Sequence, residues 1–268
     1  MIDPLDEFYT PSSSESPRGH YHYALYLDLC PDLQLQALEQ AVPSMTKGWY
    51  ELLQLSNEER IALLRDYWMT TLPFHAKLHA FLEKFFSKIV EIRFYLIQKQ
   101  PEEAFDVQIV YKDVHGQFFR GNTPASQNDI IDLKSHITEW IPPEDYVRFL
   151  KIHNGFSKGA DSGLFSISQL KVNYKVFHEM AFCESTPILD INQTEIDPSG
   201  LIPFYQSYNM NCYQCFCTDW YPSGGMGNIY YSGITHSLAS EHHPKPSPEF
   251  LAFENFSEWL IFYLEDSL

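Results

Sequence analysis

The sequence predicts an α+β fold in two parts, an N-terminal region over residues 1–125 and a second domain over residues 126–268. In the first region, apolar residues recur at helical spacing and then alternate with polar residues at the spacing of a strand. A polar, turn-rich segment, Gly121–Ser126, follows and marks the domain boundary. Shorter helical and strand patterns fill the second domain, which is expected to place helices around a mostly antiparallel sheet.

The N-terminal helices are predicted from a start signal and two apolar faces. Ser56 and Glu59 have the spacing of a capping box, in which each side chain accepts a hydrogen bond from the other residue's backbone N–H. The helix behind this box would bury Ile61, Leu64 and Trp68. A second helix is expected over residues 74–87. Its predicted apolar side consists of Phe74, Leu78, Phe81, Leu82 and Phe85.

An antiparallel hairpin is predicted from the change of period after residue 89. Four apolar residues alternate there with Glu91, Arg93 and Tyr95, which is typical of a strand with one buried face. These four are Val90, Ile92, Phe94 and Leu96. A second alternating run covers residues 105–111, and a third strand is expected at 117–120.

The second domain is predicted from shorter patterns. Helices are expected over residues 128–139, 143–150, 172–181 and 257–265. Strands are expected over 163–170, where a turn follows, and over 201–205, 213–220 and 228–231. Large apolar residues at regular spacing usually pack in the core, so five of them are assigned to it: Tyr146, Phe149, Leu150, Trp259 and Leu260.

An ordered series of short motifs runs through this domain. The motifs are Ile141–Tyr146, Phe149-Leu150, Asn154-Gly155, Gly163–Ile167, Leu201–Pro203, Cys215–Asp219 and Phe256–Leu260. Over residues 128–268 their order and spacing resemble the SUKH superfamily, which includes bacterial polymorphic-toxin immunity proteins and fungal cell-wall-synthesis regulators. The resemblance implies a module that binds another protein. In an immunity protein that partner would be a toxin domain, often a nuclease or deaminase, neutralised by direct occlusion.

The charge of the chain restricts its partners. The formal net charge is −17, which disfavours nucleic acid and anionic membranes because both repel acidic surfaces. No Lys or Arg occurs from Val176 to Pro244, although the same stretch holds seven carboxylates. This stretch is either a solvated acidic face or a docking surface for a basic protein. The candidate partner-binding residues are Glu179, Glu184, Asp190, Glu195, Asp197, Asp219, Trp220 and Tyr221.

Further aromatic residues have the chemistry of interface anchors. They are Tyr205, Tyr208, Tyr213, Tyr230 and Tyr231. An acidic surface would steer a basic partner toward the chain, and such aromatic side chains would then hold it.

Three cysteines are the strongest metal candidate. Cys212, Cys215 and Cys217 could bind zinc together with His242 or His243. On a strand, however, Cys212 would face away from the other two, whereas zinc ligands must converge. Buried reduced thiols are the preferred interpretation, and a zinc module or metal-dependent enzyme stays open as an alternative.

Catalytic motifs are incomplete in this sequence. His178-Glu179 begins like a zinc-protease helix, but Phe182 occupies the place of the second His. The glycine-rich segment Gly224–Gly227 is followed by neither Lys-Ser nor Lys-Thr, and no Gly-x-Ser-x-Gly elbow occurs. The sequence therefore predicts a protein that is not an enzyme and has no catalytic, cofactor or metal site.

These observations converge on a non-enzymatic protein-binding module. The leading interpretation is an immunity protein that neutralises a toxin by direct binding. The alternative is an intracellular scaffold or regulatory protein without a toxin partner. A cytoplasmic location without membrane contact is expected, because the five cysteines are an odd number, the N-terminus lacks an apolar signal core, and no apolar run reaches about 18 residues.

Overall fold

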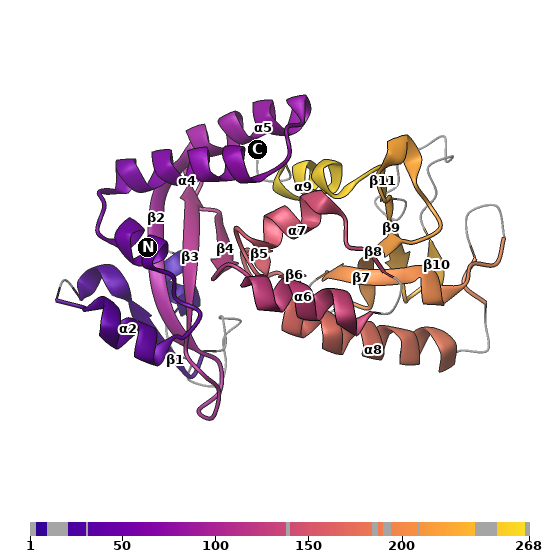
Figure 1. Cartoon of the computed structure of the whole chain (residues 1–268), viewed down its shortest axis with the longest axis horizontal. Helices are drawn as coiled ribbons and strands as arrows, with labels where there is room; N and C mark the ends of the chain where they lie inside the picture. Colours follow the sequence, from indigo (N-terminus) through magenta and orange to yellow (C-terminus); the bar gives the residue numbers. More distant parts are fainter. Residues whose placement is uncertain are drawn as a thin grey trace. The chain divides into compact units, whose positions relative to one another are not determined.

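The computed structural model describes residues 4–9, 21–30, 32–137, 140–183, 187–189, 194–207, 210–238 and 251–265 (Figure 1). Its helices and antiparallel strands confirm the predicted α+β class. The chain forms two compact units, which are described separately. Unit 1 comprises Met1–Ser126 and Phe149–Ala160, and unit 2 comprises Gln127–Arg148 and Asp161–Leu268. A domain boundary after residue 125 stays a prediction.

Unit 1 is built on an antiparallel sheet. Its strands are β1 (Tyr23–Tyr26), β2 (Ile89–Gln98), β3 (Asp106–Asp113), β4 (Phe118–Asn122) and β5 (Phe156–Lys158), each paired with the next. The long β2–β3 hairpin is the one that the alternating pattern predicts. The helices of this unit are α1 (Pro4–Tyr9), α2 (Leu35–Ala41), α3 (Lys47–Leu53), α4 (Asn57–Thr71) and α5 (Ala76–Lys88), with the 3-10 turn η1 (Leu27–Leu29) after β1.

Helices α4 and α5 lie side by side along the β2–β3 hairpin (Figure 1). The capping box of Ser56 and Glu59 is present at the start of α4, as the sequence predicts. Trp68 on α4 is fully buried and donates its indole N–H to the hydroxyl oxygen of Tyr111 on β3, at 3.2 Å. Its ring also packs against Phe85 of α5. These contacts make one face of the sheet the main core of unit 1.

The predicted apolar side of α5 is wrong at its first residue. The helix begins at Ala76, with His75 as its N-cap, so Phe74 precedes it and is 83% exposed. His75 stops the helix from starting earlier, because its ring nitrogen accepts the backbone N–H of Leu78 at 3.2 Å. Leu78, Leu82 and Phe85 are buried as predicted.

The prediction of a single buried face on β2 is also wrong. A register shift between Ile89 and Glu91 leaves Val90 46% exposed. Beyond the shift, Phe94 is buried on one face of the strand, and Tyr95 and Ile97 are buried on the other. The second face is covered by α1 and Tyr21, which pack on Tyr95 and Ile97. An alternating pattern cannot reveal this cover, because the covering residues lie about 75 to 90 positions earlier in the chain.

Unit 2 is built on antiparallel strands. Its strands are β6 (Gly163–Leu164), β7 (Leu201–Gln206), β8 (Cys212–Cys217) and β9 (Asn228–Ser232), and β9 also pairs with β10 (Ser237–Leu238) and β11 (Ala252–Phe253). The helices are α6 (Gln127–His136), α7 (Glu144–Leu150, whose last two residues belong to unit 1), α8 (Ile167–Cys183) and α9 (Phe256–Glu265). Two 3-10 turns, η2 (Pro198–Gly200) and η3 (Pro222–Gly224), complete the unit.

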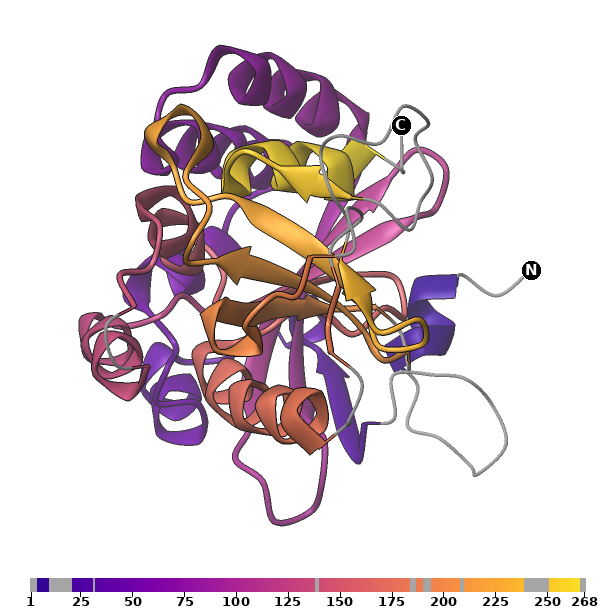
Figure 2. The same cartoon turned by 90° about the vertical axis from the view of Figure 1, so that its right-hand side faces the viewer.

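Helices α8 and α9 lie on opposite sides of the β7–β9 strands (Figure 2). Tyr213 on β8 packs against Phe177 of α8, with ring centres 5.3 Å apart. Phe216 faces the other side and contacts Phe256 of α9. Because both faces of β8 are covered, all six of its residues are buried.

The five residues assigned to the core from sequence are all buried, Phe149 and Leu150 in unit 1 and the other three in unit 2. Tyr146 packs against Phe204 and Phe216 inside unit 2, and Trp259 packs against Phe204. Phe149 and Leu150, at the end of α7, are fully buried, as is Leu260. Asp145 joins α7 to the start of α9, because its carboxylate accepts the backbone N–H and the hydroxyl of Ser257 at 2.9 and 3.0 Å.

Helix α8 starts five residues earlier than the sequence prediction of 172–181. The strand predicted over 163–170 is only two residues long, and the helix follows it. Ser166 and Gln169 form a reciprocal pair: the Ser166 hydroxyl accepts the Gln169 backbone N–H, and the Gln169 side chain accepts that of Ser166. This is a capping box of the Ser-x-x-Gln type, a signal present in the sequence that the strand assignment missed.

Candidate protein-binding site

Three segments of unit 2 meet where the lysine- and arginine-free stretch is richest in carboxylates. They are the C-terminal half of α8, the turn η2, and the loop after β8. The imidazole Nε2 of His178 on α8 lies 2.9 Å from the carbonyl oxygen of Pro198 and 3.1 Å from that of Leu201. The backbone N–H of Thr218 donates to the carbonyl of Gly200 at 2.9 Å. These hydrogen bonds hold η2 between α8 and the end of β8.

Two exposed carboxylates lie at η2. Asp197 caps this turn, because its carboxylate accepts the backbone N–H of Ser199 at 2.8 Å. The same bonding holds the pKa of Asp197 below its usual range, so this carboxylate stays charged in mildly acidic solution. Asp219 lies beside Gly200, where an added Cβ would be 3.3 Å from a carboxylate oxygen of Asp219 and 2.9 Å from the hydroxyl of Thr218. A side chain at position 200 would therefore require the Thr218 hydroxyl to move.

An aromatic pair follows Asp219. Trp220 is half-buried, and its indole ring lies against Gly227, where an added Cβ would overlap the ring. The backbone N–H of Gly227 donates to the carbonyl of Trp220 at 2.9 Å and closes the loop. Tyr221 is 56% exposed at the loop surface. The loop thus presents one fixed and one accessible aromatic ring beside an acidic residue.

The remaining predicted acidic residues are placed differently. Glu179 is exposed on α8 and lies 3.7 Å from the ammonium of Lys175, which partly neutralises it. Glu195 is exposed in a short bridge with Leu189. Glu184 and Asp190 lie outside the described residues. The structure therefore brings together Asp197, Asp219, Trp220 and Tyr221, which we call the acidic end of unit 2.

Two of the predicted aromatic anchors are inaccessible. Tyr213 and Tyr231 are buried, and both rings pack against Phe177 beneath α8. Tyr205 and Tyr230 are half-buried, and Tyr208 lies outside the described residues. The anchoring prediction is wrong for Tyr213 and Tyr231, because helix α8 covers both rings. The sequence does not reveal this cover, since it depends on tertiary packing.

The sequence analysis missed an exposed apolar residue near the acidic end. Phe182 at the end of α8 is 59% exposed, and its ring centre lies 5.7 Å from that of His178. The signal was available, since Leu170, Phe177 and Ala181 mark the buried face of this helix and Phe182 falls outside it. Phe182 therefore adds an accessible aromatic ring on the α8 side of His178.

The cysteine cluster has the environment of buried thiols. Cys212, Cys215 and Cys217 are free and buried on β8. Burial raises the pKa of the Cys215 and Cys217 thiols, which keeps them protonated and unreactive. Among the described residues, no group of three or more His, Cys, Asp or Glu side chains is placed to hold a metal ion. His242 and His243 lie outside the described residues.

The architecture defines an α+β module in which helices cover a mostly antiparallel sheet. The sequence model of the SMI1 / KNR4 family (SUKH-1) matches residues 115–261, more than half of the chain. The chain belongs to the SMI1 / KNR4 family (SUKH-1), which confirms the resemblance seen in the ordered motifs. No curated protein sequence matches this chain. None of the helices in the described part of the chain is long and apolar enough to cross a membrane.

The match begins earlier than the predicted start near residue 128. It includes β4, whose residues Phe119–Gly121 pair with Phe156–Lys158 of β5. A strand that pairs with β5 belongs structurally with the family segment, although the polar break after it resembles a boundary. The family segment thus includes residues of both units.

Proposed function

We propose that this chain is a non-enzymatic protein-binding module whose acidic end of unit 2 receives a basic surface of another protein. The observation that carries the proposal is a pair of exposed carboxylates: Asp197 caps the turn η2, and Asp219 lies beside Gly200 of that turn. The accessible ring of Tyr221 follows two residues after Asp219. No Lys or Arg occurs within the surrounding Val176–Pro244 stretch to neutralise them. Exposed charge of one sign speeds association with an oppositely charged partner, and aromatic rings supply much of the contact energy.

The more specific form of the proposal is an immunity role. Membership of the SUKH-1 family supports a partner that is a protein, and a toxin nuclease or deaminase with a basic surface would fit the acidic end. Binding would neutralise such a toxin by covering its active site. A regulatory partner in the same cell is the competing outcome, and it would use the same surface without blocking any toxic activity.

The binding test uses the purified 268-residue chain and any basic toxin domain encoded beside its gene. Stopped-flow association and calorimetry measure the rate and the affinity at low and high salt. We expect the double variant Asp197→Asn/Asp219→Asn to slow association by roughly threefold to tenfold at low salt, with little difference at high salt. Asparagine at position 197 keeps the cap on η2, so the fold is preserved.

A matched control is the double variant Glu254→Gln/Glu265→Gln. It removes two exposed carboxylates of the same unit that lie outside the lysine- and arginine-free stretch. Equal slowing by both double variants would show that net charge alone acts, and the proposed surface would be wrong. Toxin activity measured in the same samples separates an immunity protein, which abolishes it, from a regulator, which does not bind the toxin.

A further inference from the structure

Helix α1 lies in unit 1 like a peptide in a groove. Its three apolar residues, Leu5, Phe8 and Tyr9, follow the i, i+3, i+4 spacing of one helical face, and all are buried. Asp6 and Glu7, between them, are exposed. The floor is the face of β2, β3 and β4 opposite to α4 and α5. It consists of Tyr95, Ile97, Val110 and Phe118, with Tyr21 at its side.

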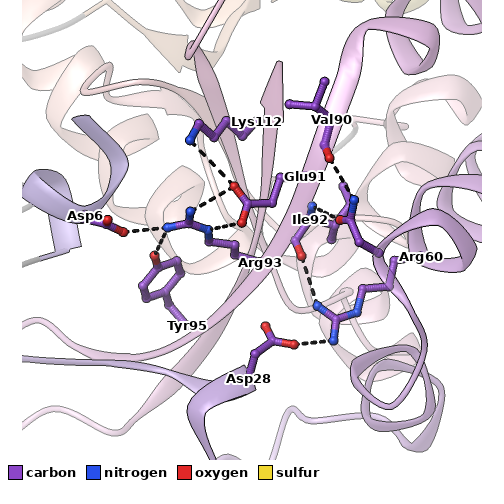
Figure 3. Close-up of polar contacts among 10 residues, drawn as sticks. Asp6, Asp28, Arg60, Val90, Glu91, Ile92, Arg93, Tyr95 and Lys112 are labelled. Carbon is purple, nitrogen blue, oxygen red and sulfur yellow. Dashed lines mark hydrogen bonds and ion pairs between the residues drawn. The ribbon is translucent and has the colours of Figure 1, made fainter. Parts of the chain in front are cut away.

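An arginine recognises the carboxylate of this helix. The guanidinium Nη1 of Arg93 on β2 lies 2.6 Å from a carboxylate oxygen of Asp6 (Figure 3). Glu91 on the same strand holds the other side of the guanidinium at 2.7 and 2.9 Å. Arg93 is 13% exposed, so it is a fixed, largely desolvated donor. Such a donor binds a carboxylate only at one defined position.

The aromatic residues of α1 have equally specific partners. The ring of Tyr9 stacks on that of Tyr95, with centres 3.8 Å apart, and its hydroxyl donates to Gln108 at 2.8 Å. The guanidinium carbon of Arg120 on β4 lies 4.6 Å from the ring centre of Phe8. Three apolar anchors, one ion pair and one cation–π contact thus seat a helix of only six residues.

We propose that this face, the α1 groove, is a docking site for a helical segment of a partner protein, and that α1 occupies it as a tethered competitor. The partner segment would carry three anchors at i, i+3 and i+4, two of them aromatic, with a carboxylate directly after the first. This inference concerns unit 1 and is independent of the function proposed for unit 2.

Two observations favour a replaceable occupant over a permanent part of the core. A helix of six residues is too short to be stable alone, so α1 is helical because the groove holds it. The sheet beneath it keeps a complete core on its opposite face, where Trp68, Phe94 and Tyr111 are buried without contribution from α1. The apolar floor nevertheless needs a cover, since such surfaces are rarely left open to water.

A cavity adjoins the groove floor. A cavity of about 380 Å³ is lined by Ile97 of the groove floor together with Asp106 and Asn122. Asn122 accepts a hydrogen bond from Gln108, the residue that binds the hydroxyl of Tyr9. A longer partner segment could reach this cavity and gain contacts that α1 lacks. Such contacts are needed, because a tethered competitor acts at an effective concentration on the order of millimolar.

The test uses the full-length protein and a fluorescent peptide with the sequence of residues 1–10. In the variant Leu5→Ser/Phe8→Ser the tethered helix is weakened, and we expect the peptide to bind at least tenfold more tightly than to the unchanged protein. A peptide with the same residues in scrambled order should not bind. Fluorescence anisotropy gives both affinities. Equal binding to the two proteins, or no binding to a folded variant, would overturn the proposal.

Arg93 provides the specificity control. Arg93→Gln in the weakened background should reduce the peptide affinity about tenfold, through the loss of one charge-assisted hydrogen bond to the carboxylate. Arg65→Gln removes the same charge from an exposed arginine of α4 and should leave the affinity unchanged. Equal effects of the two substitutions would mean that the peptide responds to general charge, which would overturn the assigned role of Arg93.

A second measurement covers the case in which the weakened variant does not fold. A protease site placed within residues 11–17 of the otherwise unchanged full chain lets α1 be cut and diluted away. The proposal expects the remaining chain to keep its circular dichroism and to rebind the peptide. Unfolding after cleavage would show that α1 is part of the core and would overturn it. A dimer that depends on α1 would also overturn it, because the occupant would then be a second copy of this chain.

Discussion

The acidic end of unit 2 and the α1 groove of unit 1 are two surfaces with opposite chemistry. The first is open to solvent, and the second is covered by α1. The acidic end presents carboxylates and an accessible tyrosine ring directly to solvent. The α1 groove presents aromatic rings and two arginines, and a segment of the same chain covers it. Exposed charge costs little to leave in water, whereas an apolar floor must be covered. In the two proposals, the acidic end would attract a partner from a distance, and the α1 groove would bind one by contact.

Acid should destabilise unit 1 through one buried histidine, and this is the largest effect that we expect. His153 in unit 1 is fully buried between the hydroxyl of Tyr111 and the carbonyl of Asn122, and burial lowers its pKa to about 4. An unfolded histidine has a pKa of about 6.5 and binds a proton first. The contribution of His153 to the stability of unit 1 is therefore fully present above pH 6.5. It falls as the pH drops toward 4, by up to about 3 kcal/mol.

The measurement is urea unfolding of the unchanged protein and of His153→Asn at several values of pH. The variant should be less stable at neutral pH but should lose less on acidification. The carboxylate of Asp197 should stay charged through the same window, because its pKa is lowered. Parallel pH profiles for the two proteins would show that other groups cause the acid sensitivity.

Truncation of one aromatic ring on each surface should have unequal effects on stability. Phe8→Ala removes a buried anchor from the α1 groove and should lower the free energy of unfolding by about 2 kcal/mol. The proposal that α1 can detach makes this loss smaller than for a central core residue. Tyr221→Ala at the acidic end should change it by less than about 0.5 kcal/mol, since the ring is mostly exposed. Chemical denaturation measures both, and equal losses would contradict the contrast between a covered and an open surface.

The geometry of the acidic end can be disturbed with one methyl group. A Cβ at position 227 would overlap the ring of Trp220, so Gly227→Ala should displace that ring and cost about 1–3 kcal/mol of stability. Gly225→Ala is the control, because its Cβ would meet its nearest neighbours at an ordinary 3.6 Å. Tryptophan fluorescence should shift in the first variant only. A shift of equal size in both would show that Gly227 does not position Trp220.

Much of the fold could be predicted because its signals are local. The capping box at Ser56, the alternation on β2 and the apolar spacing on α7 each depend on residues within one helix or strand. The start of α8 was equally local, yet a glycine-bounded apolar run resembles a short strand as much as a helix start. The capping box of Ser166 and Gln169 decides between the two only once the side chains are seen to bond.

The candidate site was only partly predictable. The absence of Lys and Arg between Val176 and Pro244 marks the region in the sequence, but exposure within it depends on packing. Tyr213 and Tyr231 have the same chemistry as Tyr221, and only the cover of α8 makes them inaccessible. The contact between the α1 groove and its occupant left no sequence signal, because about 90 to 110 residues separate the two.

By itself, the sequence determined the α+β class, the order of the family motifs and the absence of Lys and Arg between Val176 and Pro244. These follow from periodicity, short-range hydrogen bonding and composition, which need no knowledge of neighbours distant in sequence. Only the tertiary structure decided that Asp219 lies beside Gly200 of the turn that Asp197 caps, and that Leu5, Phe8 and Tyr9 cover one face of β2. Contacts of this kind join residues far apart in the chain, and packing in three dimensions selects them.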